Sequence, residues 1–330
     1  MSAEESVVID PQAIKELQLL DAHLSDVDTE ITAKQHLMNA PILAQRQSTI
    51  AKIPGFWAVV FDNAAAELEA AITPSDSEVF AKALTTVEVL RPEIPSGAKP
   101  TDLGLDKFGE PRSVTINFHF KENEWFSDSV LSKTLYYRHG KDRSAGLVSE
   151  PIKINWKAGK DLTEGLTDAA YALWATQKQN ASQQLDGALA GDARKARDAA
   201  AKELPEYKNV VKLLGEKVNG AISFFNFFSY RGRWTSAQEN AEARAEVKAR
   251  RAAALAGKDE EEEDEDEDFD ELDFAEEDVE TFPPGHDVAV SIADDIWPNA
   301  IDYFLADSID SDLEIDDEDD EDEDEDVEME

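Results

Sequence analysis

The stretch that decides the fold is residues 10–53, DPQAIKELQLLDAHLSDVDTEITAKQHLMNAPILAQRQSTIAKI. It opens as a helix, because Asp10 is a good N-cap and Pro11, at the first helical position, has no N–H to leave unpaired. Apolar side chains then recur at alternating spacings of three and four residues, which is the pattern of a narrow a/d seam. The seam is formed by Leu17, Leu20, Leu24, Val27, Ile31 and, after an interruption at Lys34, Met38.

A narrow apolar seam on a long helix requires a partner helix, and the simplest partner is a second copy of the same chain. Packing of the helix on the chain's own body is the alternative. Pro41 predicts a kink or an end, because proline removes one backbone hydrogen bond and clashes with the preceding turn. If the helix resumes and reaches Ile53, it is a rod of about 65 Å.

The region after the helix predicts an α+β body. Alternating apolar and polar residues from Val114 to Phe120 have the period of a half-buried strand. Similar segments predict an antiparallel meander with one solvated face, with strands near Thr85–Leu90, Ser113–Phe120, Lys133–Arg138 and Val148–Trp156. The proline-rich stretch at 90–112 predicts a long surface loop.

The remaining sequence divides by composition. Residues 165–220 are Ala-rich and predict a helical insertion, whereas the Phe-rich segment Ser223–Phe228 predicts core. Residues 236–256 predict a polar helix that projects into solvent. We expect a flexible arm at 1–9, a dimerisation helix at 10–53 and a body with its insertion at 54–230. An inserted polar helix with an acidic block follows at 231–285, then a final helix at 286–306 and an acidic disordered end at 307–330.

The charge is concentrated at one end of the chain. Residues 259–330 contain 38 Asp or Glu and no Lys or Arg, while residues 1–258 hold the other 35 acids and all 32 bases. Such a block repels itself and cannot bury enough apolar surface to fold alone. It also repels nucleic acid and anionic lipid, so we expect no direct DNA binding and no membrane binding. A strongly basic partner is expected instead, and histones are the commonest such partners.

Signals for catalysis and for cofactor binding are missing from the sequence. There is no Cys, so disulfides and thiolate metal sites are excluded. The five His residues show no metal-ligand spacing, and no phosphate loop, nucleophile elbow or dinucleotide fingerprint is present. No signal peptide and no membrane-spanning run are expected. We therefore expect a protein that is not an enzyme and needs no cofactor.

Five ordered segments together resemble the nucleosome assembly protein family, in its SET/template-activating-factor branch. They are Ile50-Ala51-Lys52-Ile53-Pro54-Gly55-Phe56-Trp57, Val130-Leu131-Ser132-Lys133, the run from Ile154 to Thr163, Ser223-Phe224-Phe225-Asn226-Phe227-Phe228, and Asp294-Asp295-Ile296-Trp297-Pro298-Asn299 followed by Tyr303-Phe304-Leu305. The resemblance covers about 13–163, 222–230 and 286–330. It implies a homodimer held by the long kinked helix, with an "earmuff" domain of four-stranded antiparallel sheet and helices on each copy.

The same resemblance implies a histone chaperone that holds core histones under the earmuffs. Carried over by position, the underside falls on Asn226, Ser229 and Tyr230, with Lys157, Lys160, Asp161 and Asp287 nearby. Acids with embedded aromatics at Phe269 and Phe274 form a second candidate anchor, the alternative being that they dock on the body. Sequence near 90–112, 165–220 and 231–285 exceeds the family pattern.

Nuclear residence, with shuttling to the cytoplasm, is expected from this partner. The main alternative is a regulatory scaffold that binds a histone acetyltransferase or inhibits a protein phosphatase. A chaperone alone prevents histone–DNA aggregation, whereas a scaffold needs its enzyme. Tail binding should weaken steeply with salt, since exposed charges are screened within about 8 Å at physiological ionic strength.

Overall fold

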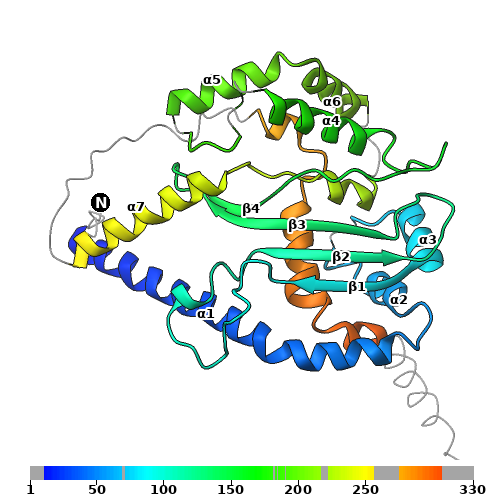
Figure 1. Ribbon diagram of the computed structural model, residues 1–330, viewed down its shortest axis with the longest axis horizontal. Helices are drawn as coiled ribbons and strands as arrows, with labels where there is room; N and C mark the ends of the chain where they lie inside the picture. The colour runs from blue at the N-terminus through cyan, green and yellow to red at the C-terminus, as the bar shows by residue number, and fades with distance from the viewer. Residues whose placement is uncertain are drawn as a thin grey trace, which may run out of the picture.

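The computed structural model describes residues 11–68, 71–180, 183, 185–189, 191–216, 222–255 and 275–306. Its centre is a four-stranded antiparallel sheet in the order β1-β2-β3-β4. The strands are Leu84–Leu90, Val114–Phe120, Val130–His139 and Ala145–Ser149. The α+β architecture and the meander are confirmed. Figure 1 shows α1 along one edge of the molecule and α4, α5 and α6 on the opposite side of the sheet.

The long helix α1 runs from Pro11 to Ile50 and passes through Pro41 without ending. At about 1.5 Å per residue it is a rod of roughly 60 Å, and Figure 1 shows that it bends along its length. Its C-terminal end is tied to the body. Ile50 enters the main core, and the Arg46 guanidinium donates to the Pro298 carbonyl and lies over the Trp297 ring.

Two short helices, α2 (Phe56–Asn63) and α3 (Pro74–Ala83), lead into β1. The start of α3 is fixed by a reciprocal cap: the Thr73 hydroxyl accepts from the Asp76 N–H, and the Asp76 carboxylate accepts from the Thr73 N–H. Such a box satisfies two backbone donors that the first turn leaves without partners. Asp76 is buried and also accepts from the Ser223 hydroxyl and the Phe224 N–H, so α3 is joined to the Phe-rich segment.

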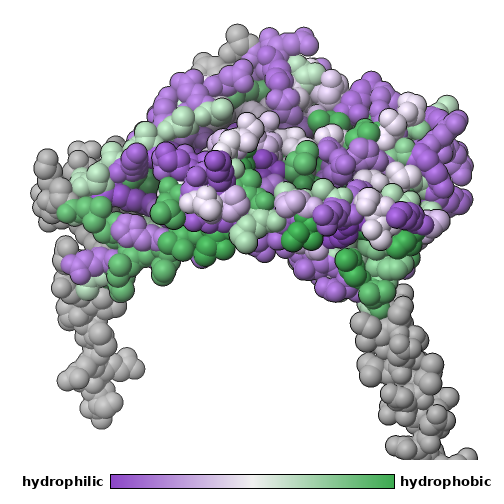
Figure 2. Space-filling view, turned by 60° about the horizontal axis from the view of Figure 1, so that its bottom comes forward, coloured by the Kyte–Doolittle hydropathy of each residue, from purple (hydrophilic) through white to green (hydrophobic). Residues whose placement is uncertain are grey.

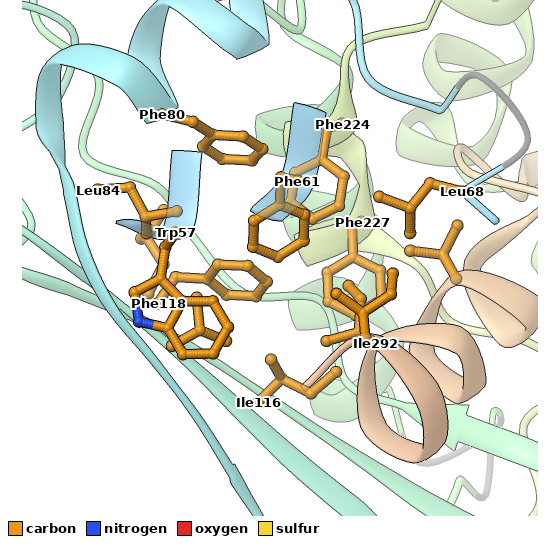
Figure 3. Close-up of a cluster of buried hydrophobic side chains, with 14 of the residues drawn as sticks. Trp57, Phe61, Leu68, Phe80, Leu84, Ile116, Phe118, Phe224, Phe227 and Ile292 are labelled. Atoms are coloured by element: carbon orange, nitrogen blue, oxygen red, sulfur yellow. The ribbon is translucent and has the colours of Figure 1, made fainter. Parts of the chain in front are cut away.

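The main core lies between one face of the sheet and the helices α2, α3 and α8 (Gly285–Val290). A short 3-10 helix, Phe224–Ser229, contributes four phenylalanines that are all fully buried. Figure 3 shows Phe224 and Phe227 among the rings and aliphatic chains of the sheet and helices. The edge-on contact of Phe118 with Phe224, at 5.6 Å between ring centroids, is typical of the cluster.

The fourth strand lies earlier in the chain than the sequence predicts. It spans Ala145–Ser149, directly after a turn at Gly140–Ser144, and pairs with β3 from His139 to Leu135. The segment predicted as strand, from Val148 to Trp156, is mostly irregular and keeps a single bridge between Trp156 and Phe126. Pro151 explains the early end, because it has no N–H to continue a ladder.

The insertion predicted between 165 and 220 contains three helices, α4 (Leu166–Gln179), α5 (Gly191–Lys202) and α6 (Pro205–Glu216). Its own small core includes Leu173 and Val210. Residues 275–284, which we call the cover segment, return the chain from the acidic block to this core: Ala275 and Val279 are buried in it. From the sequence alone we assign these residues to the acidic block.

The polar helix α7 spans Ala237–Leu255 and does not simply project into solvent. Its first half packs on β3, where the Asn240 side chain accepts from the His139 N–H. Farther along, Arg251 pairs with Asp26 of α1 at 2.8 Å, and Figure 1 shows α7 reaching from the sheet to the N-terminal part of α1. The lack of a wide apolar stripe on α7 does not predict this packing, because polar side chains make the contacts.

The last helical region begins as α8 and continues as a π-helical turn, Ser291–Ile296. A helical stretch resumes at residues 300–306, after Pro298. The turn places the Trp297 indole N–H on the Val87 carbonyl at 3.1 Å, at the outer edge of β1. It also brings Asp294 to Arg91. The edge strand is thereby covered, which removes a site for strand-to-strand aggregation.

Candidate protein interface

The apolar seam of α1 is exposed along its whole length. All six seam residues predicted from the sequence lie at the surface, with 54 to 65% of each side chain accessible, and Ile42 continues the row beyond Met38. Figure 2, which turns the α1 edge toward the viewer, shows hydrophobic residues gathered along that edge. A contiguous apolar surface of this kind marks an interaction site.

The opposite side of α1 faces the body. Thr29 and Ala33 are buried there, and the short 3-10 turn Leu105–Lys107 of the loop 91–112 packs on α1. The Gly104 N–H donates to the Glu30 carboxylate at 3.1 Å. The helix therefore has one covered stripe and one uncovered stripe, and packing on its own body accounts for the covered stripe alone.

The residues predicted for the underside are buried rather than displayed. Asn226, Ser229 and Tyr230 are at most 5% exposed. The Asn226 amide donates to the Ser223 carbonyl, the Ser229 hydroxyl bonds the Thr281 hydroxyl, and the Tyr230 hydroxyl donates to the Leu147 carbonyl at 3.1 Å. As placed, these three side chains organise the interior and are not available to a partner.

The cover segment is what hides them. The Glu280 carboxylate accepts from the N–H groups of Arg231 and Gly232 at 3.1 and 2.9 Å, and Phe282 is fully buried. Burial raises the pKa of the Tyr230 phenol, and the nearby carboxylates of Glu280 and Asp287 add to the shift. The phenol therefore stays neutral and acts as a hydrogen-bond donor.

A buried ion cluster anchors the cover segment to α5. Glu276 pairs with Arg197 at 2.5 Å, and Arg197 also pairs with Asp198. All three side chains are less than a tenth exposed. Burial raises the pKa of the Asp198 carboxyl, and the like charge of Glu276 raises it further. Removing one member of such a buried pair is strongly destabilising, because it leaves an uncompensated charge.

Lys157, Lys160 and Asp161 form a separate surface turn. Lys157 is exposed and donates to the Asn123 carbonyl, while Lys160 pairs with Glu124. The Asp161 carboxylate accepts from the N–H groups of Thr163 and Gly165 and so shapes the turn before α4.

Asp287, in the first helical turn of α8, is exposed. It lies far from the surface turn that carries Lys157. Its neighbour His286 accepts from the N–H of Leu147, a β4 residue that pairs with Tyr137 near the end of β3. The Lys157 turn lies at the other end of β3, because Asn155, just before it, donates to Asp128, just before β3 begins. Eight residues of strand separate the two positions, roughly 25 Å. The structure therefore does not bring Asp287 together with the Lys157 turn.

Phe269 and Phe274 lie outside the described residues, so neither the anchor nor the docking prediction can be placed. Within the described ranges, no group of three His, Asp or Glu residues could hold a metal ion. Among the helices that the structure describes, none combines the length and the apolar character needed to cross a membrane.

Comparison with known proteins decides the family. The model of the nucleosome assembly protein family matches residues 8–307. The chain belongs to the nucleosome assembly protein family. The fold described above, with its long helix and its four-stranded antiparallel sheet, is therefore a nucleosome assembly protein fold.

Curated relatives of this family member match about half of it. A putative nucleosome assembly protein of Schizosaccharomyces pombe is 28% identical over 163 residues, 46% of this chain and 60% of the relative. Protein SETSIP of Homo sapiens is 30% identical, over 45% of this chain and 44% of the relative. Protein SET of Drosophila melanogaster is 27% identical, over 47% and 52%. The matched region spans about half the length of these relatives.

Solved structures align over more of the chain. The crystal structure of Ccp1 is 23% identical, with a TM-score of 0.48, and the alignment covers 89% of this chain and 95% of that one. A malaria parasite nucleosome assembly protein is 16% identical, with a TM-score of 0.38, covering 91% and 98%.

Two features of this nucleosome assembly protein escaped the sequence reasoning. The first is the cover segment, which has the composition of the acidic block. The apolar pair Val279 and Phe282, with the two prolines that follow, is the sequence signal that could have indicated an ordered segment. The second is Lys133, which stands at the start of the predicted strand Lys133–Arg138 and is fully buried. For Lys133 the sequence carries no signal beyond its place on the apolar side of the alternation, between Leu131 and Leu135.

Proposed function

We propose that this chain is a histone chaperone that works as a homodimer in the nucleus, shields core histones from DNA and promotes nucleosome assembly and disassembly. The observation that carries the proposal is a body of the nucleosome assembly protein family whose last 72 residues, 259–330, hold 38 acids and no base. The curated relatives named nucleosome assembly protein and SET support the same role.

The mechanism is competition with DNA for basic surfaces. Duplex DNA carries one charge per about 1.7 Å of axis, so free histones bind it without regard to sequence. The acidic segments supply a high local negative potential and fast capture, while the folded body supplies shape and therefore selectivity among basic proteins. The same negative charge disfavours direct contact with DNA.

Histone contacts are proposed at the candidate residues that reach the surface. Asp161 and Asp287 offer carboxylates, and Lys157 and Lys160 flank Asp161 on its turn. Asn226, Ser229 and Tyr230 would act from beneath by positioning the cover segment and the start of α8, which carries Asp287. The proposed anchor at Phe269 and Phe274 adds apolar contact within the acidic block.

The dimer follows from the exposed seam of α1. Fully burying a Val, Leu, Ile or Met side chain contributes about 1.5–3 kcal/mol, and seven such seam positions stand uncovered on each copy. A second copy of α1 covers them with side chains of matching length and spacing. A C₂ pair is also the commonest arrangement for such an interface.

Light-scattering mass, with and without stoichiometric core-histone pairs, tests the whole proposal at about 0.15 M salt and again at a few-fold higher salt. We expect a particle of about 73 kDa, twice the 36.5 kDa chain, that binds histones and prevents histone–DNA aggregation without an added enzyme. A truncation ending at Asp307 should bind more weakly and retain the salt-resistant part. Complete loss of binding in the truncation would leave only a polyanion effect and reject the folded seat.

The dimer itself has a matched pair of variants. Leu24→Asp buries a charge in the seam and should give monomers. Ser25→Asp adds the same charge one residue away, on an exposed position outside the seam, and should remain dimeric. Equal masses for both variants would place the interface elsewhere.

A further inference from the structure

Leu103, in the loop 91–112, is 78% exposed, more than any other large apolar side chain that the structure describes. The loop around it is otherwise well held: Phe108 is fully buried, and Glu110, also buried, forms a two-pronged pair with Arg112. A leucine displayed by an anchored loop differs from one on a free tip, because its position is fixed and something can be built to meet it.

The anchor places Leu103 beside α1. Its neighbour Gly104 donates to Glu30, and the ammonium of Lys34, which pairs with Glu30 at 2.7 Å, lies 5.9 Å from the centre of the Phe108 ring. Lys34 is the residue that interrupts the apolar seam. The loop therefore meets α1 at the one polar position of the seam, through the Gly104 N–H on Glu30 and the Phe108 ring beside Lys34.

Helix geometry shows on which side of α1 the loop and Leu103 lie. At about 100° per residue, Ala33 on the covered stripe and Ile31 on the seam stand about 160° apart, and Glu30 and Lys34 fall between them. Leu103 is thus carried on the flank of α1 that borders the uncovered seam, so the apolar surface of the seam continues onto the loop.

Lys34 also favours one orientation of the α1 pair. In a parallel two-fold dimer each residue faces its own copy, which sets Lys34 against Lys34 in the seam. An antiparallel pair avoids this repulsion and places opposite helix ends side by side, as the helix dipoles prefer. The middle of the helix and of its exposed seam, from Leu17 to Ile42, both fall near Glu30.

We propose that the loop 91–112 is part of the dimer interface and that the Leu103 side chains of the two copies meet over the two-fold axis. The inference rests on the α1 homodimer of the proposed function. In an antiparallel pair the axis is perpendicular to the helices, so it carries a group at the middle of one helix to the same flank of the other. In a parallel pair the axis runs along the helices and carries it to the opposite flank.

The chain contains no Cys, so single-cysteine variants of the full-length protein can be spin-labelled cleanly. Labels in Leu103→Cys should lie within about 25 Å of each other by pulsed electron paramagnetic resonance. Labels in Leu17→Cys should lie about 40 Å apart, because the two Leu17 positions are offset by some 26 residues of helix in an antiparallel pair. The reverse order of distances would establish a parallel pair and overturn the inference.

A second readout does not depend on labels. Leu103→Ser should raise the dimer dissociation constant at least several-fold, measured by analytical ultracentrifugation, with an unchanged circular dichroism spectrum. Val211→Ser, at an exposed position on α6, is the matched control and should leave dimerisation unchanged. A dimer equally stable in both variants would overturn the role of Leu103 while leaving the α1 homodimer intact, whereas a monomeric wild-type chain would reject both.

Discussion

The ammonium of Lys133 on β3 donates to the backbone carbonyl of Tyr230 at 2.6 Å. It also donates to the carbonyls of Phe228 and Glu150, at 3.0 and 2.8 Å. One fully buried side chain thus joins three carbonyls at the end of the Phe-rich segment and after β4, in addition to the Ser149 hydroxyl on the Tyr230 carbonyl and the Ile152 N–H on the Phe228 carbonyl. Lys133 acts as a clamp between the sheet and the segment that closes the core.

The first prediction is that Lys133 makes stability depend on pH. Burial lowers its pKa to about 7, from 10.5 for a free side chain, with Glu280 and Glu150 opposing the shift. Between those values the unfolded chain binds more protons than the folded one, so the free energy of unfolding rises with pH, by at most about 1.4 kcal/mol per unit. Below pH 7 the full cost of burying the charge is present.

Denaturant unfolding of wild type and Lys133→Met at several pH values between 7 and 10 checks this. The variant removes one donor from each of three carbonyls, but Phe228 and Tyr230 keep bonds from the Ile152 N–H and the Ser149 hydroxyl. The Glu150 carbonyl therefore loses most, at a cost on the order of 1–3 kcal/mol. The variant should be less stable, and the gap should widen as pH rises. Lys82→Met removes an exposed lysine from α3 and should track the wild type. Parallel pH curves for wild type and Lys133→Met would contradict the assignment.

The second prediction concerns the cover segment. Glu276→Ala leaves Arg197 paired with Asp198 and removes the hydrogen bond that ties the cover segment to α5, so it should cost on the order of 1–3 kcal/mol locally. Hydrogen exchange should therefore quicken in residues 275–284 and at Ser229 and Tyr230 beneath them. If the covered surface takes part in histone binding, affinity should change in the same variant.

Glu277 provides the control for that experiment. It carries the same carboxylate in the same segment but is exposed, so Glu277→Ala should leave exchange at Ser229 unchanged. Both variants remove one negative charge. A similar loss of protection in the two would mean that overall charge, and not the buried pair with Arg197, holds the segment down.

The third prediction uses the start of α8. A Cβ on Gly285 would lie 2.3 Å from two carbons of the Tyr230 ring, and the ring is fixed through its hydroxyl on Leu147. Gly285→Ala should therefore destabilise the fold by about 1–3 kcal/mol through overpacking. The loss should shrink in a Tyr230→Ala background, as expected for two residues in contact.

Gly215, near the end of α6, has nothing within 4 Å of an added Cβ. Gly215→Ala should be neutral or stabilising by up to about 1 kcal/mol, since alanine favours helix. Thermal unfolding of the two alanine variants side by side separates the steric effect from the effect of removing a glycine. Equal melting temperatures would show that Tyr230 can move aside.

The sequence predicts those features of the fold that follow from local periodicity, and it does not predict those that depend on contacts between distant residues. The α1 seam and the strand at Val114–Phe120 follow from local spacing, and both lie where the sequence places them. The burial of Asn226 and Ser229 could not be predicted from the sequence, because it depends on the cover segment with Thr281, some fifty residues away beyond an acidic block. The packing of α7 was missed for a similar reason: Asn240 and Arg251 meet β3 and α1 through polar contacts that leave no apolar stripe.

The last prediction joins the loop 91–112 to the dimer. Phe108 is fully buried, and the ammonium of Lys34 of α1 lies near its ring, so Phe108→Ala should loosen the loop without touching the exposed seam. Spin labels at Leu103→Cys should then show a broadened distance distribution, while labels at Leu17→Cys keep theirs. Because Phe→Ala costs about 3–5 kcal/mol where a core cannot collapse, thermal unfolding must first show that the variant is folded. An unchanged Leu103 distribution in a folded variant would mean that Glu30 and Gly104 alone hold the loop on α1.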